Sequence, residues 1–509
     1  MIVTGAVLAA VAAWAGPAAA QTPGLPVLPI PGDALGGSVA PFEGSAATPA
    51  HVGGMTQPPR NPFMAPNGRS NIHDDAYMTD TYAVTGPLGD GPASSTLFSR
   101  ECASITFDSQ GRIVTICVGL DRPVLALLDP HSLAVLAAMP LPIRNLGAGG
   151  NPFTDFSGGG YFYLDQHDRA AISTNDHHVL VVSESGPGFA VDHDYDLSAK
   201  IPAADGIVSV LPDWNGRLWF VTRGGLVGTI ERGDGTVRAM KLAGEGISNS
   251  FAVDETGGVF LVSDEALYRV DADSKGAPTV SWRVVYPNSG VHKPGQSDAG
   301  SGTTPTLMGR KWVAITDNAD PMDVVVYRRA RVLPKPKKKH KRGKAKGRLI
   351  CSAQVFGQGA GSTDNSLIGT NRSLVVENNY GYVISAGDLG GAESVPGITR
   401  VDVVKKKARH RRRKKRFRCR TVWTSNERSP SVVPKLSLAN GLVYAYTKPP
   451  RTDGLDAWYL TALDFRTGRT VYRRLAGTGF GFNNNYAPVT LGPDGTAYVG
   501  VLGGLVELP

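Results

Sequence analysis

Cysteine is scarce in this chain. Four cysteines are spread over 509 residues, and no two of them have the C-x-x-C spacing. The common cysteine zinc sites are therefore excluded, and four thiols are far too few for a scaffold held together mainly by disulfides. The four are Cys102, Cys117, Cys351 and Cys419.

One pairing of these cysteines follows from a turn between them. The segment Asp108-Ser109-Gln110-Gly111 has the residues of a hairpin turn. With Ser109 and Gln110 at its centre, Cys102 faces Cys117 on the neighbouring strand. The alternative is a pair of free buried thiols, and the same two alternatives stay open for Cys351 and Cys419.

Long apolar runs and familiar catalytic motifs are also absent. Beyond residue 20 no stretch of ~18 uncharged apolar residues occurs, so we expect no later membrane span. There is no Gly-x-Ser-x-Gly, phosphate loop or His-Glu-x-x-His motif, which leaves the commonest hydrolase and nucleotide sites without support.

Residues 1–20 have the features of a cleaved signal peptide. An apolar run from Ile2 to Trp14 is followed by Ala18-Ala19-Ala20 before Gln21, as signal peptidase requires. The alternative is an uncleaved anchor. We expect a secreted protein that is extracellular or associated with the cell envelope. Residues 21–70, rich in Pro, Gly and Ala, are predicted to form a flexible, disordered leader.

Glycine and proline are abundant, at 62 and 36 residues, and they favour many turns between short strands. From about residue 100 a unit of roughly 40–45 residues recurs, which is the period of a propeller blade. We predict an all-β β-propeller over residues 71–509, with eight four-stranded blades and seven as the alternative. The aligned turns begin at Phe107, Pro212, Val253 and Leu491.

Closure of the ring is predicted to use an N-terminal strand. The last unit, from residue 483, contains only three strands, so a fourth must come from elsewhere. We assign this role to Ala76–Gly86. The preceding residues His73-Asp74-Asp75 are interpreted as turn chemistry.

The repeat at 460–472 resembles that of a known superfamily. Ala462, Asp464, Thr467 and Gly468, with Tyr472 in the position usual for Trp, are similar to the A-x-D-x-x-T-G-x-x-x-W repeat of quinoprotein (pyrroloquinoline quinone-type) propellers. Weaker copies contain Asp129, Asp271 with Trp282, and Asp402 with Trp423. The resemblance implies that the Asp caps a turn and that the aromatic residue packs between blades. The vicinal cysteine pair of the quinone dehydrogenases is absent, so a pyrroloquinoline quinone cofactor is not expected.

Positive charge is concentrated in two insertions, residues 328–348 and 405–418. The runs Arg328–Arg348 and Arg400–Arg420 hold 12 and 13 Lys and Arg residues, which is 25 of the 53 in the chain. Because the remainder has 28 basic and 43 acidic residues, its balance is −15. We expect both insertions to be disordered loops joining the third and fourth strands of neighbouring blades, on the face opposite the ligand funnel. The candidate anion-binding residues are Lys337, Lys338, Lys339, Lys341, Arg342, Arg411, Arg412, Arg413, Lys414 and Lys415.

Polar residues gather where the propeller funnel should open. Val313–Asn318 aligns with Leu374–Asn379, so two adjacent blades are expected to direct oxygen atoms at one axis. Such oxygen ligands suit calcium, for which Asp317, Asn318, Glu377 and Asn379 are the candidates; turn capping is the alternative. The full set of funnel candidates is Asp317, Asn318, Asp320, Asp364, Asn365, Glu377, Asn378, Asn379, Asn483 and Asn484.

Two functions follow from these features. The first is a monomeric, non-enzymatic scaffold that docks through the basic loops to an anionic envelope or extracellular polymer, without sequence-specific nucleic-acid recognition. The second is an extracellular enzyme, a calcium-dependent hydrolase or a carbohydrate-active lyase, with its site in the funnel. No catalytic residue is assigned from the sequence. The first function is favoured, because the segregation of charge is visible in the sequence and a catalytic constellation is not.

Overall fold

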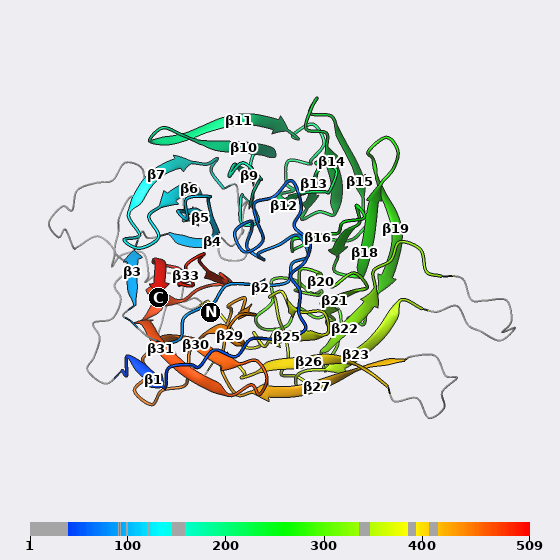
Figure 1. The fold of residues 1–509 in the computed structure, drawn as a ribbon. Coiled ribbons are helices and arrows are strands. Elements are labelled where there is room, and N and C mark those ends of the chain that lie inside the picture. The colour runs from blue at the N-terminus through cyan, green and yellow to red at the C-terminus, as the bar shows by residue number, and fades with distance from the viewer. Residues whose placement is uncertain are drawn as a thin grey trace, which may run out of the picture.

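Eight sheets surround a common axis in a computed structural model (Figure 1). Seven are antiparallel, and the sheet of blade 7 also contains one parallel pair. The model describes residues 39–89, 91, 93–97, 100–119, 122–144, 158–334, 347–384, 393–406 and 416–509. Within these ranges the only helical element is the 3-10 turn η1 (Phe480–Phe482), and no helix is long and apolar enough to cross a membrane. The predicted eight-bladed β-propeller is confirmed; the expected signal peptide, residues 1–20, lies outside the described residues.

The first four blades follow one another along the chain, each beginning at the axis and ending at the rim. Blade 1 comprises β4 (Glu101–Phe107), β5 (Ile113–Val118), β6 (Val124–Leu128) and β7 (Val135–Pro140). Blade 2 comprises β8 (Tyr163–Leu164), β9 (Ala170–Ser173), β10 (His178–Ser185) and β11 (Gly188–Asp196). Blade 3 comprises β12 (Ile207–Pro212), β13 (Leu218–Thr222), β14 (Leu226–Ile230) and β15 (Val237–Lys241). Blade 4 comprises β16 (Ala252–Val253), β17 (Val259–Val262), β18 (Ala266–Ala272) and β19 (Pro278–Val285).

The remaining blades complete the ring, and two of them recruit N-terminal strands. Blade 5 comprises β20 (Thr306–Met308), β21 (Trp312–Thr316), β22 (Asp323–Arg328) and β23 (Leu349–Gln354). Blade 6 comprises β24 (Ile368–Gly369), β25 (Ser373–Glu377), β26 (Ile398–Lys405) and β27 (Phe417–Ser425). Blade 7 comprises β28 (Lys435–Ser437), β29 (Leu442–Thr447), β30 (Ala457–Asp464) and β31 (Thr470–Thr478), flanked by β1 (Phe42–Gly44) and β2 (Thr81–Tyr82). Blade 8 comprises β32 (Val489–Leu491), β33 (Ala497–Val501), β34 (Gly504–Leu508) and β3 (Ser94–Leu97).

The Asp-containing turns identified in the sequence join the first and second strands of blades 1, 3, 4 and 8, and blade 2 has an equivalent turn at Asp165. In blades 1 to 3 the Asp accepts backbone N–H bonds from residues two and four positions later. Each of these carboxylates also forms an ion pair with the Arg four residues later, so backbone hydrogen bonds and a side-chain ion pair both stabilise the turn. These pairs are Asp108–Arg112, Asp165–Arg169 and Asp213–Arg217.

Burial follows strand position within a blade. Every residue of β13 is buried, because both faces of a middle strand pack against neighbouring blades. The outermost β15 is only partly covered along its whole length. Continuous apolar runs therefore mark inner strands, and alternating or polar runs mark the rim.

The ring closes with a different strand from the one predicted. Ser94–Leu97 (β3), not Ala76–Gly86, pairs antiparallel with β34 as the outermost strand of blade 8. The prediction that an N-terminal strand completes the last blade is correct, but the segment was wrong. The physical reason is burial: Ala76, Tyr77, Met78 and Tyr82 are each about 1% exposed, which an edge strand at the rim cannot provide.

The segment predicted to close the ring instead lies at the axis. We call residues 61–82 the axial segment; its β2 pairs in parallel with β28. Backbone carbonyls of this segment accept N–H bonds from the innermost strands of blades 1, 2, 4, 5, 6 and 7, and Asn61 donates to Pro212 of blade 3. The carbonyls belong to Arg69, Ser70, Ala76, Tyr77, Thr79 and Asp80. The axial segment therefore fastens seven blades at their centre.

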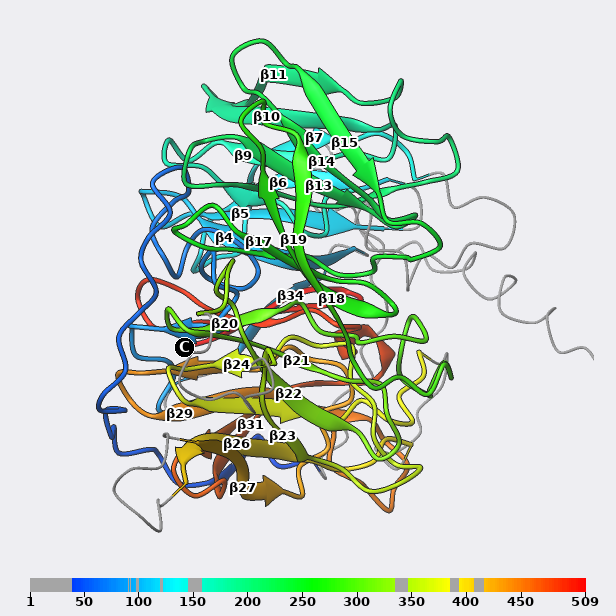
Figure 2. The ribbon, with the colours of Figure 1, turned by 90° about the vertical axis from the view of Figure 1, so that its right-hand side faces the viewer.

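Part of the segment expected to be a flexible leader also lies on the propeller. We call residues 39–60 the strap. Its β1 pairs antiparallel with β31 at the rim of blade 7, and Val52 donates its N–H to Leu438 O at 2.9 Å. The blue N-terminal chain runs along one face of the ring in both views (Figures 1 and 2).

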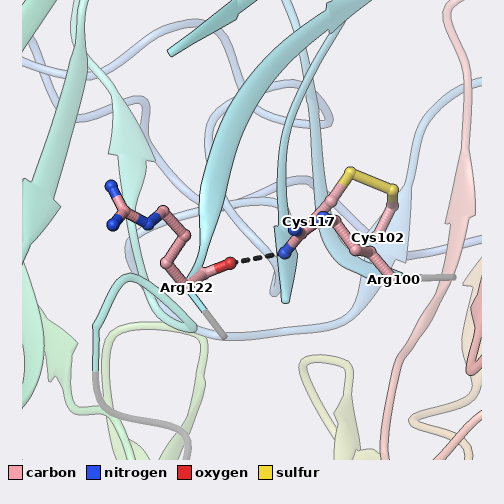
Figure 3. The surroundings of a disulfide bond; sticks show 4 residues. All are labelled: Arg100, Cys102, Cys117 and Arg122. Atoms are coloured by element: carbon pink, nitrogen blue, oxygen red, sulfur yellow. Dashed lines mark hydrogen bonds between the residues drawn. A yellow bond between two sulfur atoms is a disulfide. The ribbon is translucent and has the colours of Figure 1, made fainter. Parts of the chain in front are cut away.

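Both cysteine pairs are disulfides. Cys102 faces Cys117 as predicted (Figure 3), but the register arises differently. Phe107 pairs with Ile113, one residue out of the expected register, and a bulge between Cys102 and Ser104 restores it at the cysteines. The second disulfide joins Cys351 of β23 to Cys419 of β27, across two blades.

Candidate functional site

The propeller encloses a small cavity on its axis. Its floor is formed by Ile72 and His73 of the axial segment, and its volume is about 70 Å³. The axial segment bonds to the ends of innermost strands, at Phe107, Val253 and Gly369, whereas the cavity lies where those strands begin. The walls include Glu101, Tyr161, Asn249, Asp364, Asn365, Ser366, Asn485 and Tyr486.

A chain of hydrogen bonds leads from this cavity into the axial segment. His73 Nε2 lies 3.3 Å from Ser366 Oγ, and His73 Nδ1 lies 3.0 Å from Asp80 Oδ1. The same Asp80 oxygen accepts a hydrogen bond from Lys435 Nζ at 2.5 Å. All four side chains are buried. This serine–histidine–aspartate arrangement was missed at the sequence level, because His73 and Asp80 were interpreted as parts of a turn and a rim strand.

Charge in this network is balanced by one lysine. Lys435 Nζ also lies 3.5 Å from Asp74 Oδ2, and the two carboxylates raise the pKa of Lys435 above its ordinary value despite burial. The ammonium and His73 lower the pKa of Asp80, whereas burial raises that of Asp74. Burial likewise raises the pKa of Asp75 to about 7. The axial segment is thus held by an ion pair that is shielded from water.

Two of the ten predicted funnel residues line the cavity, Asp364 and Asn365. Asp364 Oδ2 accepts the N–H of Ser297 at 2.6 Å, and burial raises its pKa to about 7. The amide of Asn365 donates to Ser431 O and Val432 O, both at 3.0 Å, and to Glu377. Asn365 therefore ties blade 6 to the chain entering blade 7.

Glu377 lies at the centre of this hydrogen-bonded connection between blade 6 and the chain that enters blade 7. It accepts hydrogen bonds from Asn379 Nδ2 at 2.9 Å and Ser429 Oγ at 2.7 Å, in addition to Asn365. Burial raises the pKa of Glu377 to about 8. The carboxyl group is consequently protonated at neutral pH and works as a hydrogen-bonding hub between blades.

The aligned residues of blades 5 and 6 cap equivalent turns. Asp317 Oδ1 accepts the N–H groups of Ala319 and Asp323, and Asn378 Oδ1 accepts those of Tyr380 and Ser362. The remaining candidates also make protein contacts. Asn318 donates to Asn288 and Val291, Asp320 accepts from Gly359, and Asn483 and Asn484 accept from Tyr382 and Ser431.

The calcium candidates are therefore engaged in bonds within the protein. Glu377 bonds three donors, and burial raises the pKa of Asp317 to about 7. Among the described residues no three His, Cys, Asp or Glu side chains form a group that could hold a metal ion. Calcium at Asp317, Asn318, Glu377 and Asn379 stays a prediction of the sequence.

The flanks of the two basic insertions lie next to each other. The insertions connect β22 to β23 and β26 to β27, the third and fourth strands of blades 5 and 6. The Cys351–Cys419 disulfide, with a Cα–Cα distance of 5.4 Å, joins the two outer strands close to the loop ends. The ten candidate anion-binding lysines and arginines, between Lys337 and Lys415, lie outside the described residues.

A groove lies beside these loop ends, on the face of the axial segment. Its volume is about 800 Å³, and its basic lining residues are Arg310, Lys311, Arg372, Arg400 and Lys405. Arg400 pairs with Asp402, with Nε 2.9 Å from Oδ1. No Asp or Glu is among the residues that line the groove in the described part of the chain.

Comparison with known proteins assigns no family to this chain. No family model matches the chain. A protein of Archaeoglobus fulgidus, described as an "Uncharacterized protein", is 27% identical over 333 residues, which is 61% of this chain and 62% of that protein. The chain thus spans less than two thirds of that relative.

Solved structures similar to this chain are β-propeller proteins. BamB from Moraxella catarrhalis has a TM-score of 0.38 and 12% identity, covering 64% of this chain and 92% of its own. A streptogramin B lyase has a TM-score of 0.37 and 10% identity, covering 81% and 94%. Virginiamycin B lyase from Staphylococcus aureus has a TM-score of 0.35 and 10% identity, covering 75% and 98%. Likeness at this level concerns the fold alone.

Proposed function

We propose that this protein is an exported propeller scaffold that docks through its two basic loops to an anionic envelope or extracellular polymer. One observation carries the proposal: the Cys351–Cys419 disulfide holds the two loop-bearing hairpins together on neighbouring blades. Residues 335–346 and 407–415 contain 15 Lys and Arg residues. Two basic loops that start at one place on a rigid scaffold present a single high density of positive charge.

The size of the axial cavity supports docking over catalysis. A space of about 70 Å³ is well below the ~300 Å³ at which ligand pockets usually begin. The groove beside the basic loops is about 800 Å³ and falls within the usual range. Binding at the basic face therefore needs no rearrangement of the axis.

The test compares the protein with a variant in which residues 335–346 and 407–415 are replaced by Gly-Ser segments of equal length, which leaves the disulfide in place. Binding to polygalacturonate, teichoic acid and anionic vesicles is measured against salt concentration. Docking predicts tight binding that weakens steeply with salt and is lost in the variant. Equal binding by the two proteins, or none by either, would refute it.

A hydrolase with its site at the axis is the second candidate, favoured by the chain Ser366–His73–Asp80. In this mechanism Ser366 Oγ forms a bond to the carbonyl carbon of an ester while its proton moves to His73 Nε2. His73 then donates that proton to the leaving alcohol as the ester C–O bond breaks, and Asp80 orients the imidazole. A water molecule, deprotonated by His73, attacks the acyl-serine and releases the carboxylic acid, and His73 returns the proton to Ser366 Oγ. Release of a chromophore from aryl acetates, lost in Ser366→Ala, would support it; equal rates for both proteins would exclude it.

We also propose membership of the quinoprotein-type superfamily, supported by the turn at Asp464. Its Oδ1 accepts the N–H and Oγ1–H of Thr467, both at 2.7 Å, and Gly468 packs against the ring of Trp423 in the adjacent blade. Asp129 caps its turn in the same way, whereas the corresponding cap in blade 4 is Asp273, not Asp271. We expect a monomer without bound quinone; light scattering and absorbance spectroscopy of the purified protein test both points.

A further inference from the structure

The groove beside the basic loops has the features of a built binding site. The strap forms one wall through Val52–Met55, and it is held there by the bond from Val52 N to Leu438 O. Two turns also line the groove, Gly309–Lys311 of blade 5 and Thr370–Arg372 of blade 6. The lining further includes Lys405 and Phe417, where the second basic loop begins and ends.

Three cations in this groove have no acidic partner among the residues that the structure describes. Lys311, Arg372 and Lys405 are exposed and form no ion pair with any described residue. Of the two paired cations that line the groove, Arg400 is bound to Asp402, whereas Arg310 is 75% exposed and lies 3.7 Å from Glu255 Oε1, so Arg310 is only weakly neutralised. Uncompensated charges of one sign around a recess favour an anionic ligand.

The uncharged lining selects among anionic ligands. Trp312 and Phe417 form an apolar wall with ring centroids 5.0 Å apart at 76°, and Thr370, Asn371 and Ser373 add hydroxyl and amide groups. The hydroxyl edges of a sugar ring can form hydrogen bonds with such hydroxyl and amide groups, and a guanidinium such as that of Arg372 can bind a carboxylate through two N–H groups.

Other polyanions fit less well. Trp312 is 8% exposed and its ring packs against Phe417, so it presents no free face on which a nucleobase could stack. A flat bilayer cannot enter a recess that is lined by the strap and by turns of two blades. A second groove, of about 350 Å³, shares Met55, Gly309, Arg310, Thr370 and Asn371 with the first and continues toward Tyr77 at the axis. A recess that extends in this way suits a flexible linear chain.

We propose that this groove binds a carboxylated polysaccharide, a chain containing uronic acid units, and that Lys311, Arg372 and Lys405 contact its carboxylates. This inference rests on the proposed docking function. In this arrangement the basic loops attract the polymer at long range, and the groove distinguishes an acidic sugar chain from other polyanions.

The experiment uses short ligands. They fit in the groove, but they are too short to bind along the basic loops. Tetragalacturonate binding is measured by calorimetry at 0.15 M salt for the full chain, the variant with Gly-Ser loops, and Lys311→Ala with Arg372→Ala. Maltotetraose is the neutral ligand. Lys200→Ala with Lys275→Ala, two exposed lysines on other blades, is the matched control variant.

We expect tetragalacturonate to bind the full chain, the control variant and the loop variant with affinities within about threefold of each other. The groove variant should bind at least tenfold more weakly, since each tenfold corresponds to about 1.4 kcal/mol, and maltotetraose should not bind. The groove variant must have the same melting temperature as the full chain. We expect this because Lys311 and Arg372 are exposed.

Failure of this inference is distinct from failure of docking. If long polygalacturonate binds and needs the loops while tetragalacturonate is unaffected by the groove variant, the groove proposal is overturned and docking stands. If a sulfated tetrasaccharide, tetraphosphate or oligothymidylate binds the groove as tightly as tetragalacturonate, the carboxylated sugar is the wrong class. If neither long nor short uronate binds any variant, the groove proposal is overturned together with docking to this polymer.

Discussion

Cys351 and Cys419 form a disulfide between the outermost strands of blades 5 and 6, with their Cα atoms 5.4 Å apart. The other disulfide, Cys102–Cys117, lies within one blade. The two bonds therefore have different structural roles, because only the first joins neighbouring blades and aligns the hairpins that carry the basic loops.

Removing the inter-blade disulfide should cost more stability than removing the other. The bonds close loops with sequence separations of 68 and 15 residues, for which chain entropy predicts contributions of about 4 and about 3 kcal/mol to the free energy of unfolding. Urea unfolding of Cys351→Ser with Cys419→Ser, and of Cys102→Ser with Cys117→Ser, measures both. Equal stability of the first variant and the parent protein would show that the bond is absent in solution.

Stability should fall as the pH rises through neutrality. Burial raises the pKa of Glu377 to about 8, against an ordinary value of 4.5, so between these values the folded state holds a proton that the unfolded state has lost. The contribution of Glu377 is therefore fully present below pH 4.5 and is lost as pH rises through 8, by up to ~1.4 kcal/mol per pH unit. Asp75, Asp317 and Asp364, with pKa values raised to about 7, act in the same direction.

Glu377→Gln isolates one of these contributions, because glutamine resembles the protonated acid and does not titrate. Unfolding free energies of both proteins are measured at pH 6 and pH 8.5. The difference between the proteins should shift in favour of the variant at the higher pH. A difference independent of pH would mean that Glu377 titrates near its ordinary pKa.

Lys435→Met should strongly destabilise the axial segment. Lys435 is fully buried with its Nζ 2.5 Å from Asp80 Oδ1, and removing one partner of a buried ion pair typically costs about 3–5 kcal/mol. Adding Asp80→Asn should recover part of the loss, since no unpaired charge would remain. Urea unfolding followed by tryptophan fluorescence checks both variants; a double variant no more stable than Lys435→Met would contradict this account.

Gly468→Ala should weaken the contact between blades 6 and 7. Gly468 has φ +74, and a Cβ there would lie 2.4 Å from the ring of Trp423. Gly454, with φ +77 and open space around it, is the matched control for backbone strain alone. We expect Gly454→Ala to cost about 1 kcal/mol and Gly468→Ala about 1–3 kcal/mol more from overpacking. Equal losses would show that Trp423 moves aside without cost.

The contacts of some residues can be predicted from the residues next to them in the sequence. Asp108, Asp213 and Asp464 sit in turns whose hydrogen bonds are made within five residues, so the turn pattern alone predicts the blade boundaries. The strands that flank the basic insertions can also be predicted from the nearby sequence, because runs of charged residues interrupt otherwise regular hairpins.

The axial contacts could not be predicted in this way. Tyr77 and Asp80 pair with residues more than 200 positions away, Arg329 and Lys435, and nothing in the local pattern separates a buried axial strand from a rim strand. His73 and Ser366 likewise meet only because the ring closes, with 293 positions between them.

The sequence by itself determined the fold class, the repeat and the segregation of charge, and it offered the Cys102–Cys117 pairing as one of two alternatives, because turn chemistry, strand periodicity and composition act over short distances. Only the tertiary structure decided which segment closes the ring, what lies at the axis and which cations share a groove. Those outcomes depend on burial at the contact of seven blades, where the fully buried residues 76–82 lower the free energy more than they would at a solvent-facing rim.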